Sequence, residues 1–116
     1  MKKELGNKER LGHIIDACNY ILNSLQGVSE EDFAKNFILH TAVQKWVEII
    51  GEASTKITKD YKSRETGVEW KKIEGMRHVV VHDYFGIDLL RIWDLSQTKI
   101  GELKIKVEEL YKDYKD

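Results

Sequence analysis

The chain has 116 residues, which is the size of one domain, so we expect a single domain over residues 1–116, and its one cysteine, Cys18, excludes an internal disulfide framework. Its 19 Lys and Arg against 20 Asp and Glu leave a net charge of −1, which excludes a polybasic chain held on nucleic acid by bulk charge. No apolar run approaches the roughly 18 residues of a membrane span, and residues 1–7 are polar where a signal peptide requires an apolar segment, so we expect a soluble, cytoplasmic protein without membrane association.

The first predicted helix occupies the N-terminal quarter of the chain. Apolar residues at spacings of three and four run from Leu11 to Leu25, with charged and amide side chains outside this stripe. Gly27 is a typical residue at the end of a helix. The chain contains no proline, which also favours helices.

The second predicted helix begins after Ser29, a typical N-cap residue, and ends before the polar segment 63–67, which predicts a loop. We expect one long helix of about eight turns, with Gly51 as the place for a bend. Its apolar face comprises Phe33, Phe37, His40, Val43, Val47, Ile50, Ser54, Ile57 and Tyr61.

The third predicted helix runs from near Glu69 to His82 or Tyr84. Three consecutive valines at 79–81 could also form a strand, but so short a run without alternation favours the helix.

The fourth predicted helix is capped by Asp88 and carries apolar residues as far as Leu110. Gly101 could divide it into two. The sequence therefore predicts an all-α bundle of four long helices, or five if the last one breaks.

An arginine stands in the predicted core stripe of the third helix. At 100° per residue, an apolar or aromatic set lies within about 60° of Arg77, namely Trp70, Ile73, Val80, Val81 and Tyr84. A buried guanidinium requires a carboxylate, a set of carbonyls or a bound anion. One interpretation is therefore an ion pair with Glu48, Glu52 or Glu74 that stabilises the bundle, and the other is an anion-binding site.

Gly75, His78 and His82 share a second stripe of the same helix. Gly75 would allow another backbone or a ligand to approach closely, so we expect this stripe at or beside a two-fold interface. His78 and His82 also have the i, i+4 spacing of a metal pair, but no third ligand is indicated, and we expect no metal and no cofactor.

Two further features have simpler interpretations. Cys18 lies on an apolar stripe, where a thiol is normally an inert small hydrophobic group. Lys56, Lys59 and Lys62 form a basic row that we interpret as a solvated face.

Two blocks of the sequence resemble one known family. Residues 77–84 match the R-x₄-H-x-Y motif of HEPN-domain proteins of the DUF86, or HepT-like, family, and residues 49–53 resemble its I-G-E-A segment. The position after Arg77 is often Asn in that family and is His78 here. The resemblance extends roughly from Leu11 to Leu110.

The resemblance implies a dimeric helical bundle in which Arg77 and His82 of both subunits line a shared cleft. It further implies a metal-independent endoribonuclease that acts as the toxin of a type VII HEPN/MNT toxin–antitoxin pair. The partner would be a small MNT-type nucleotidyltransferase, the antitoxin, which transfers AMP onto the motif tyrosine, here Tyr84.

The chemistry of these residue types is consistent with that reaction. RNA supplies its own nucleophile, the 2′-OH, so cleavage needs a group that moves a proton near neutral pH and a cation at the phosphate. His82 would be the general base or acid, Arg77 would bind the phosphate, and His78 would help to position either. The alternative is a non-catalytic, nucleotide-binding partner of the nucleotidyltransferase, in which Arg77 holds a nucleotide phosphate.

Overall fold

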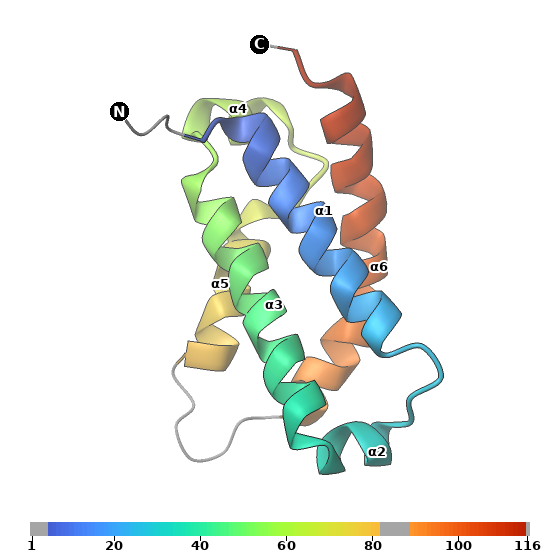
Figure 1. Cartoon of the computed structure of the whole chain (residues 1–116). Helices are drawn as coiled ribbons and strands as arrows, with labels where there is room; N and C mark the ends of the chain where they lie inside the picture. Colours follow the sequence, from blue (N-terminus) through green and yellow to red (C-terminus); the bar gives the residue numbers. More distant parts are fainter. Residues whose placement is uncertain (1–4, 82–88, 116) are drawn as a thin grey trace.

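The computed structural model describes residues 5–81 and 89–115, with the backbone alone for residues 79–81 (Figure 1). Every regular element in these residues is an α-helix, which confirms the predicted all-α class. None of the described helices is both long and apolar enough to cross a membrane. In chain order the helices are α1 (Asn7–Ser24), α2 (Glu30–Lys35), α3 (Phe37–Lys56), α4 (Lys59–Arg64), α5 (Trp70–Val81) and α6 (Leu89–Asp113).

Four helices form an elongated bundle of 44 × 28 × 27 Å. Helix α3 packs against both α1 and α5, and α1 also packs against α6. Figure 1 shows these four helices running alternately up and down, with the short α2 at one end and α4 at the other, beside the start of α1. This arrangement places α5 at the side of the bundle, where one of its faces meets α3.

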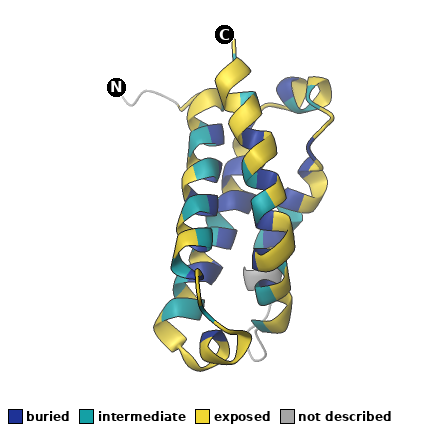
Figure 2. Ribbon diagram, turned by 90° about the vertical axis from the view of Figure 1, so that its right-hand side faces the viewer, coloured by how far each residue is buried: buried dark blue, intermediate teal, exposed yellow. Residues whose placement is uncertain are grey.

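The core consists of the inward stripes of α1, α3 and α6, as the buried residues in Figure 2 show. The predicted stripe of the first helix is confirmed, and Cys18 lies within it without exposure. Burial of each large aliphatic side chain contributes roughly 1.5–3 kcal/mol. The aliphatic side chains with no exposure are Leu11, Ile14, Ile21, Val43, Val47, Ile50, Ile92, Ile100 and Val107.

The predicted second long helix is wrong, because the segment forms three helices, α2, α3 and α4. Asn36 leaves the helical conformation (φ −95°, ψ 92°), and its side chain accepts a hydrogen bond from the backbone N–H of Leu39. Thr58, before α4, also has a non-helical backbone conformation (ψ 146°), and its hydroxyl oxygen accepts a hydrogen bond from the backbone N–H of Tyr61. Asn and Thr side chains accept hydrogen bonds from the free N–H groups at a helix start, and both residue types are less favourable inside a helix. The chain does not break at Gly51, which lies inside α3.

Because of the break at Asn36, one residue that was predicted to lie in the core is exposed. Phe37 begins α3 and is 72% exposed, whereas Phe33 of α2 is buried. The two residues belong to different helices, so the common face expected of them does not exist.

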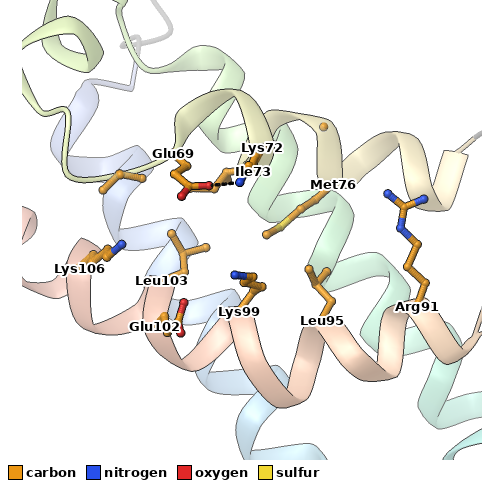
Figure 3. A pocket seen from close by; sticks show the side chains of 12 residues that line it. Glu69, Lys72, Ile73, Met76, Arg91, Leu95, Lys99, Glu102, Leu103 and Lys106 are labelled. Carbon is orange, nitrogen blue, oxygen red and sulfur yellow. Dashed lines mark ion pairs between the residues drawn. The ribbon is translucent and has the colours of Figure 1, made fainter.

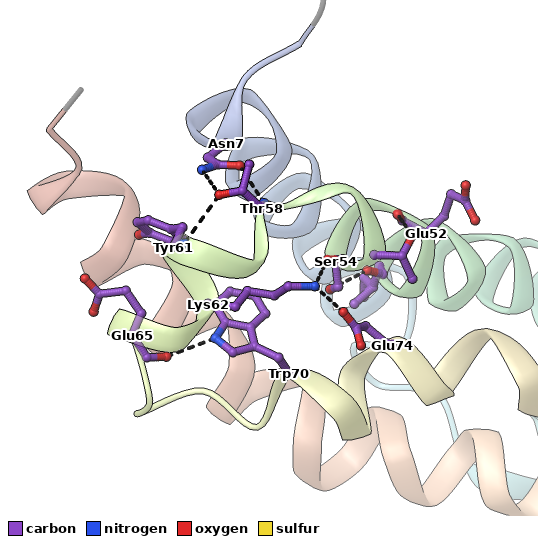
Figure 4. Close-up of polar contacts among 11 residues, drawn as sticks. Asn7, Glu52, Ser54, Thr58, Tyr61, Lys62, Glu65, Trp70 and Glu74 are labelled. Atoms are coloured by element: carbon purple, nitrogen blue, oxygen red, sulfur yellow. Dashed lines mark hydrogen bonds and ion pairs between the residues drawn. The ribbon is translucent and has the colours of Figure 1, made fainter.

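The junction before α4 is held by the start of α1. The Asn7 side chain accepts a hydrogen bond from the Thr58 N–H and donates one to its hydroxyl oxygen, each at 3.0 Å. The first residue of α1 thereby fixes the corner between α3 and α4 (Figure 4).

The last two helices agree with the prediction where the structure describes them. Helix α5 begins at Trp70, one residue after the expected start, and residues 79–81 are helical, so the strand alternative is wrong. Its predicted end near His82 or Tyr84 lies outside the described residues. Helix α6 runs unbroken through Gly101, so the bundle has no break there.

Candidate functional site

The structure describes one half of the predicted site. Arg77 and His78 lie in the second half of α5, after the buried Ile73 and Met76. The other predicted residues, His82 and Tyr84, lie outside the described residues.

Arg77 lies at a close approach between α3 and α5. A Cβ atom added to Gly51 would lie 3.0 Å from both the backbone N and the Cβ of Arg77, and 3.4 Å from the carbonyl oxygen of Glu74. Real Cβ atoms rarely come so near to backbone, so a side chain at this position would force the helices apart. Glycine at position 51 therefore sets the spacing between the two helices at the arginine.

The next residue of α3 binds the arginine. Oε2 of Glu52 accepts a hydrogen bond from Nη1 of Arg77 at 2.7 Å, and the two residues form an ion pair. Of the three carboxylates that the sequence offers, Glu52 is the partner; Glu48 pairs with Lys45, and Glu74 pairs with Lys62. The two sequence blocks, 25 positions apart, thus meet in space at Gly51, Glu52 and Arg77.

The expectation that the Arg77 guanidinium is buried is wrong. The side chain of Arg77 is 38% exposed and that of Glu52 is 49% exposed. Arginine can place its stem against a neighbouring helix while its charged end stays in water, and the close approach at Gly51 leads the side chain outward in this way. An ion pair with this exposure contributes about 0–1 kcal/mol, whereas breaking a buried pair would cost about 3–5 kcal/mol.

Glu52 also has a second cation beside it. Nζ of Lys56, one turn further along α3, lies 3.7 Å from Oε1 of Glu52. Two cations therefore share one carboxylate at the surface. A guanidinium carries five N–H donors, and an anion that replaced Glu52 would meet a site with positive charge already in excess.

The structure describes two residues of the second predicted stripe of α5, Gly75 and His78. His78 is exposed, and a Cβ atom added to Gly75, one turn earlier, would meet no other atom within 4 Å. The backbone of α5 is therefore accessible along this face. Its predicted role at a two-fold interface stays a prediction.

The interpretation of Lys62 as part of a solvated face is wrong. Its Nζ donates to the carbonyl oxygen of Ser54 at 3.0 Å and pairs with Glu74 of α5, and its side chain is only 13% exposed (Figure 4). Lys56 and Lys59 are exposed, as expected. Lys62 thus connects α4 with the end of α3 and the first half of α5.

A second polar contact fixes the start of α5. Trp70 is buried, and its indole N–H donates to the carbonyl oxygen of Glu65 at 2.9 Å. Together with the Lys62 contacts, it holds the beginning of the helix that carries Arg77.

Cys18 and the histidine pair are the other candidate reactive groups. Burial raises the pKa of the Cys18 thiol to about 12, which agrees with an inert core residue. Among the described residues, no three His, Cys, Asp or Glu side chains lie close enough together to hold a metal ion. The metal alternative depends on His82 as well as His78, and His82 is outside this region.

Several known proteins are similar to this chain over most of its length. A protein of Caldanaerobacter subterraneus subsp. tengcongensis named "Putative RNase TTE0752" is 37% identical over 100 residues, which cover 86% of this chain and 89% of the relative. "Putative RNase MJ1216" of Methanocaldococcus jannaschii is 34% identical over 106 residues, covering 91% and 88%. "Probable ribonuclease HepT" of Thermococcus cleftensis is also 34% identical over 106 residues, covering 91% and 96%. No solved structure matches the chain.

A family model also matches this chain, and the matched residues include the described part of the site. The model of the family "Ribonuclease HepT-like" matches residues 14–110, a range that contains both Gly51–Glu52 and the motif helix with Arg77. It also contains α3, α5 and most of α6, the helices on which the candidate site depends. The chain therefore belongs to the HepT-like ribonuclease family.

Proposed function

We propose that this protein is a metal-independent endoribonuclease in which Arg77 and His82 are the catalytic residues. The observation that carries the proposal is the position of Arg77, whose guanidinium lies at the surface on an exposed carboxylate in a member of a ribonuclease family. The names of the relatives as RNases support the same activity.

The exposure of the Arg77–Glu52 pair favours a functional arginine over a purely structural one. A pair worth about 0–1 kcal/mol adds little to stability, so an RNA phosphate can replace Glu52 at small cost. Until RNA binds, the hydrogen bond to Glu52 fixes the orientation of the Arg77 guanidinium. We therefore assign to Glu52 the role of a positioning residue for Arg77.

In the proposed reaction, the 2′-OH of RNA attacks the neighbouring phosphorus atom, and the bond to the 5′ oxygen of the next nucleotide breaks. His82 moves the proton as general base or acid, a role for which histidine is the usual side chain near neutral pH. Arg77 stabilises the charge that develops on the phosphate oxygens, which a planar fork of donors does better than a lysine. His78 helps to position the phosphate or the arginine. The products are a 2′,3′-cyclic phosphate and a 5′-hydroxyl.

We propose that the active unit is a homodimer with its cleft formed by both copies of α5. Membership of the HepT-like family supports this, and a symmetric dimer presents one patch to its own copy. Sedimentation should then report twice the mass of 13.6 kDa. A monomer with full activity would contradict the shared cleft.

We further propose that the protein is the toxin of a pair whose antitoxin is an MNT-type nucleotidyltransferase that transfers AMP onto Tyr84. An attached phosphate would place negative charge beside Arg77 and compete with RNA. Co-expression with the nucleotidyltransferase followed by intact-mass measurement tests this. A mass increase by AMP that is lost in Tyr84→Phe supports the modification, and suppression of toxicity without any mass change contradicts it.

The test of the catalytic proposal is RNA cleavage by the purified protein in the presence of a chelator. Arg77→Ala and His82→Ala should each abolish cleavage and keep the helical circular dichroism spectrum and the melting temperature, because the ion pair that Arg77 loses is exposed. Glu52→Gln should keep cleavage but weaken it. Unfolding of Arg77→Ala would instead identify a structural ion pair. Tight AMP binding without cleavage would favour the non-catalytic nucleotide-binding partner.

A further inference from the structure

A groove of about 420 Å³ lies between α5 and α6 (Figure 3). Its floor is apolar and is formed by side chains that are almost completely buried, Ile73 and Met76 from α5 and Leu103 from α6. Gly75 also lines the groove, and a Cβ atom there would meet nothing within 4 Å, so no side chain obstructs the opening.

The rim of the groove is basic. Four cationic side chains line it, Lys72, Arg91, Lys99 and Lys106, against the two carboxylates of Glu69 and Glu102. Glu69 pairs with Lys72 at 2.8 Å, so these two charges cancel and the excess of positive over negative groups is unchanged. The whole chain has a net charge of −1, so this local excess of positive charge is a property of the groove and not of the protein as a whole.

Lys99 and Lys106 carry most of this excess. Both are exposed, and in the part of the chain that the structure describes no carboxylate lies within 4.0 Å of either ammonium group. Seven residues apart on α6, they point in nearly the same direction and lie about 10 Å apart along the helix. Their charge reaches Glu69 on the opposite wall, whose pKa is lowered mainly by Lys72 and further by Lys99 and Lys106. Both side chains line the groove.

The groove leads towards the candidate active site. Figure 3 shows Lys106 and Glu69 at one end and Met76 and Arg91 at the other. Met76 directly precedes Arg77 in α5, whose described residues end at Val81. A ligand bound along the rim would thus approach the same segment of α5 that carries the proposed catalytic arginine.

We propose that this groove binds single-stranded RNA beside the cleavage point, with Lys99 and Lys106 contacting phosphates and unpaired bases lying on the apolar floor. The inference rests on the proposed ribonuclease function. Unpaired bases expose apolar faces that a paired helix hides, and phosphates need cations at the edge of the groove. The two-fold contact proposed for α5 fits less well on this rim, because the axis would bring an equally positive rim against this one.

The test measures binding of a fluorescent 2′-O-methyl oligonucleotide, which lacks the attacking 2′-OH and cannot be cut. Anisotropy is recorded over a series of salt concentrations for the unchanged protein and for Lys99→Gln/Lys106→Gln. The control is Lys35→Gln/Lys45→Gln, which changes the net charge equally at two exposed lysines of α2 and α3 that do not line the groove. Both doubly substituted proteins should keep the melting temperature.

Loss of two phosphate contacts should reduce the slope of log K against log salt by about 1.4, since each contact on a single strand contributes about 0.7. The weakening should be similar for oligonucleotides of different sequence. The control should keep the slope of the unchanged protein. Equal slopes for the groove variant and the control would overturn the inference, as would loss of a dimer in the groove variant without any change in slope, which would identify a second copy as the occupant.

Cleavage of unmodified RNA, measured in parallel, separates this inference from the proposed function. If the protein cuts RNA while the groove variant binds like the control, the groove inference fails and the ribonuclease proposal stands. If binding depends on Lys99 and Lys106 while no RNA is cut, the groove inference holds and the ribonuclease proposal fails.

Discussion

Replacing Gly51 by alanine tests whether the contact between α3 and α5 sets the position of Arg77. The added Cβ would lie 3.0 Å from the Arg77 backbone N and from its Cβ, atoms that cannot rotate away. The two helices would have to separate by a few tenths of an ångström to restore ordinary contact distances. Overpacking of this kind costs about 1–3 kcal/mol.

Gly101→Ala is a matched control, because Gly101 also lies inside a long helix but a Cβ atom there would meet nothing within 4 Å. Both substitutions gain about 1 kcal/mol of helix propensity, so this gain cancels in the comparison. Gly51→Ala should therefore be less stable than Gly101→Ala by about 1–3 kcal/mol, or roughly 4–12 °C in Tm for a domain of this size.

Thermal and urea unfolding followed by far-ultraviolet circular dichroism measure this difference directly. RNA cleavage should fall in Gly51→Ala at temperatures where the protein is still folded, because Arg77 moves with α5. The reasoning would be refuted if the two alanine variants unfold at the same temperature, since the contact at Gly51 would then not constrain the helices.

Other predictions concern the contacts that hold α5 and the core. Lys62→Met should lower the free energy of unfolding by about 2 kcal/mol, because Glu74 and a carbonyl lose a charged donor, whereas the exposed Lys59→Met should change it by less than about 0.5 kcal/mol. Asn36→Ala should cost about 1 kcal/mol through loss of the α3 cap, measured by urea unfolding. The pKa of Cys18 is about 12 in the folded protein against an ordinary 9.0, so only the unfolded chain releases the thiol proton between these values. The free energy of unfolding should therefore fall as the pH rises from about 9 to 12. At neutral pH, a thiol reagent should react with Cys18 only as fast as the protein unfolds.

Helical periodicity predicted the inward faces of α1 and α6 well, because burial of one apolar stripe outweighs every other local preference in both helices. It failed between Ser29 and Tyr61, where the chain breaks at Asn36 and before Thr58. Breaks of one or two residues interrupt the apolar spacing too briefly for the periodicity to reveal them. Asn and Thr are cap residues by type, and this local signal could have placed both breaks.

In the described part of the candidate site, the sequence predicted an ion pair of Arg77 with Glu52 as one alternative, but not the exposure of that pair. The stripe singled out Arg77 and limited its partner to three carboxylates, and the family motif placed Glu52 beside Gly51. Helical periodicity predicts only the direction in which a side chain leaves the backbone. It could not predict that the long side chain of Arg77 reaches water from a position on the core stripe. For the same reason Lys62 was missed, since its ammonium group bonds to Ser54 and Glu74 far from its own backbone.

The hydrogen bonds between Asn7 and Thr58 have a consequence for how the bundle opens. They connect positions 51 residues apart, and the amide of Thr58 has a side chain of another helix as its acceptor. Its protection from hydrogen exchange therefore depends on the docking of α1 and not on the integrity of α3 or α4. The exchange rate of this single amide reports how often the start of α1 leaves the bundle while the helix that carries Arg77 stays folded.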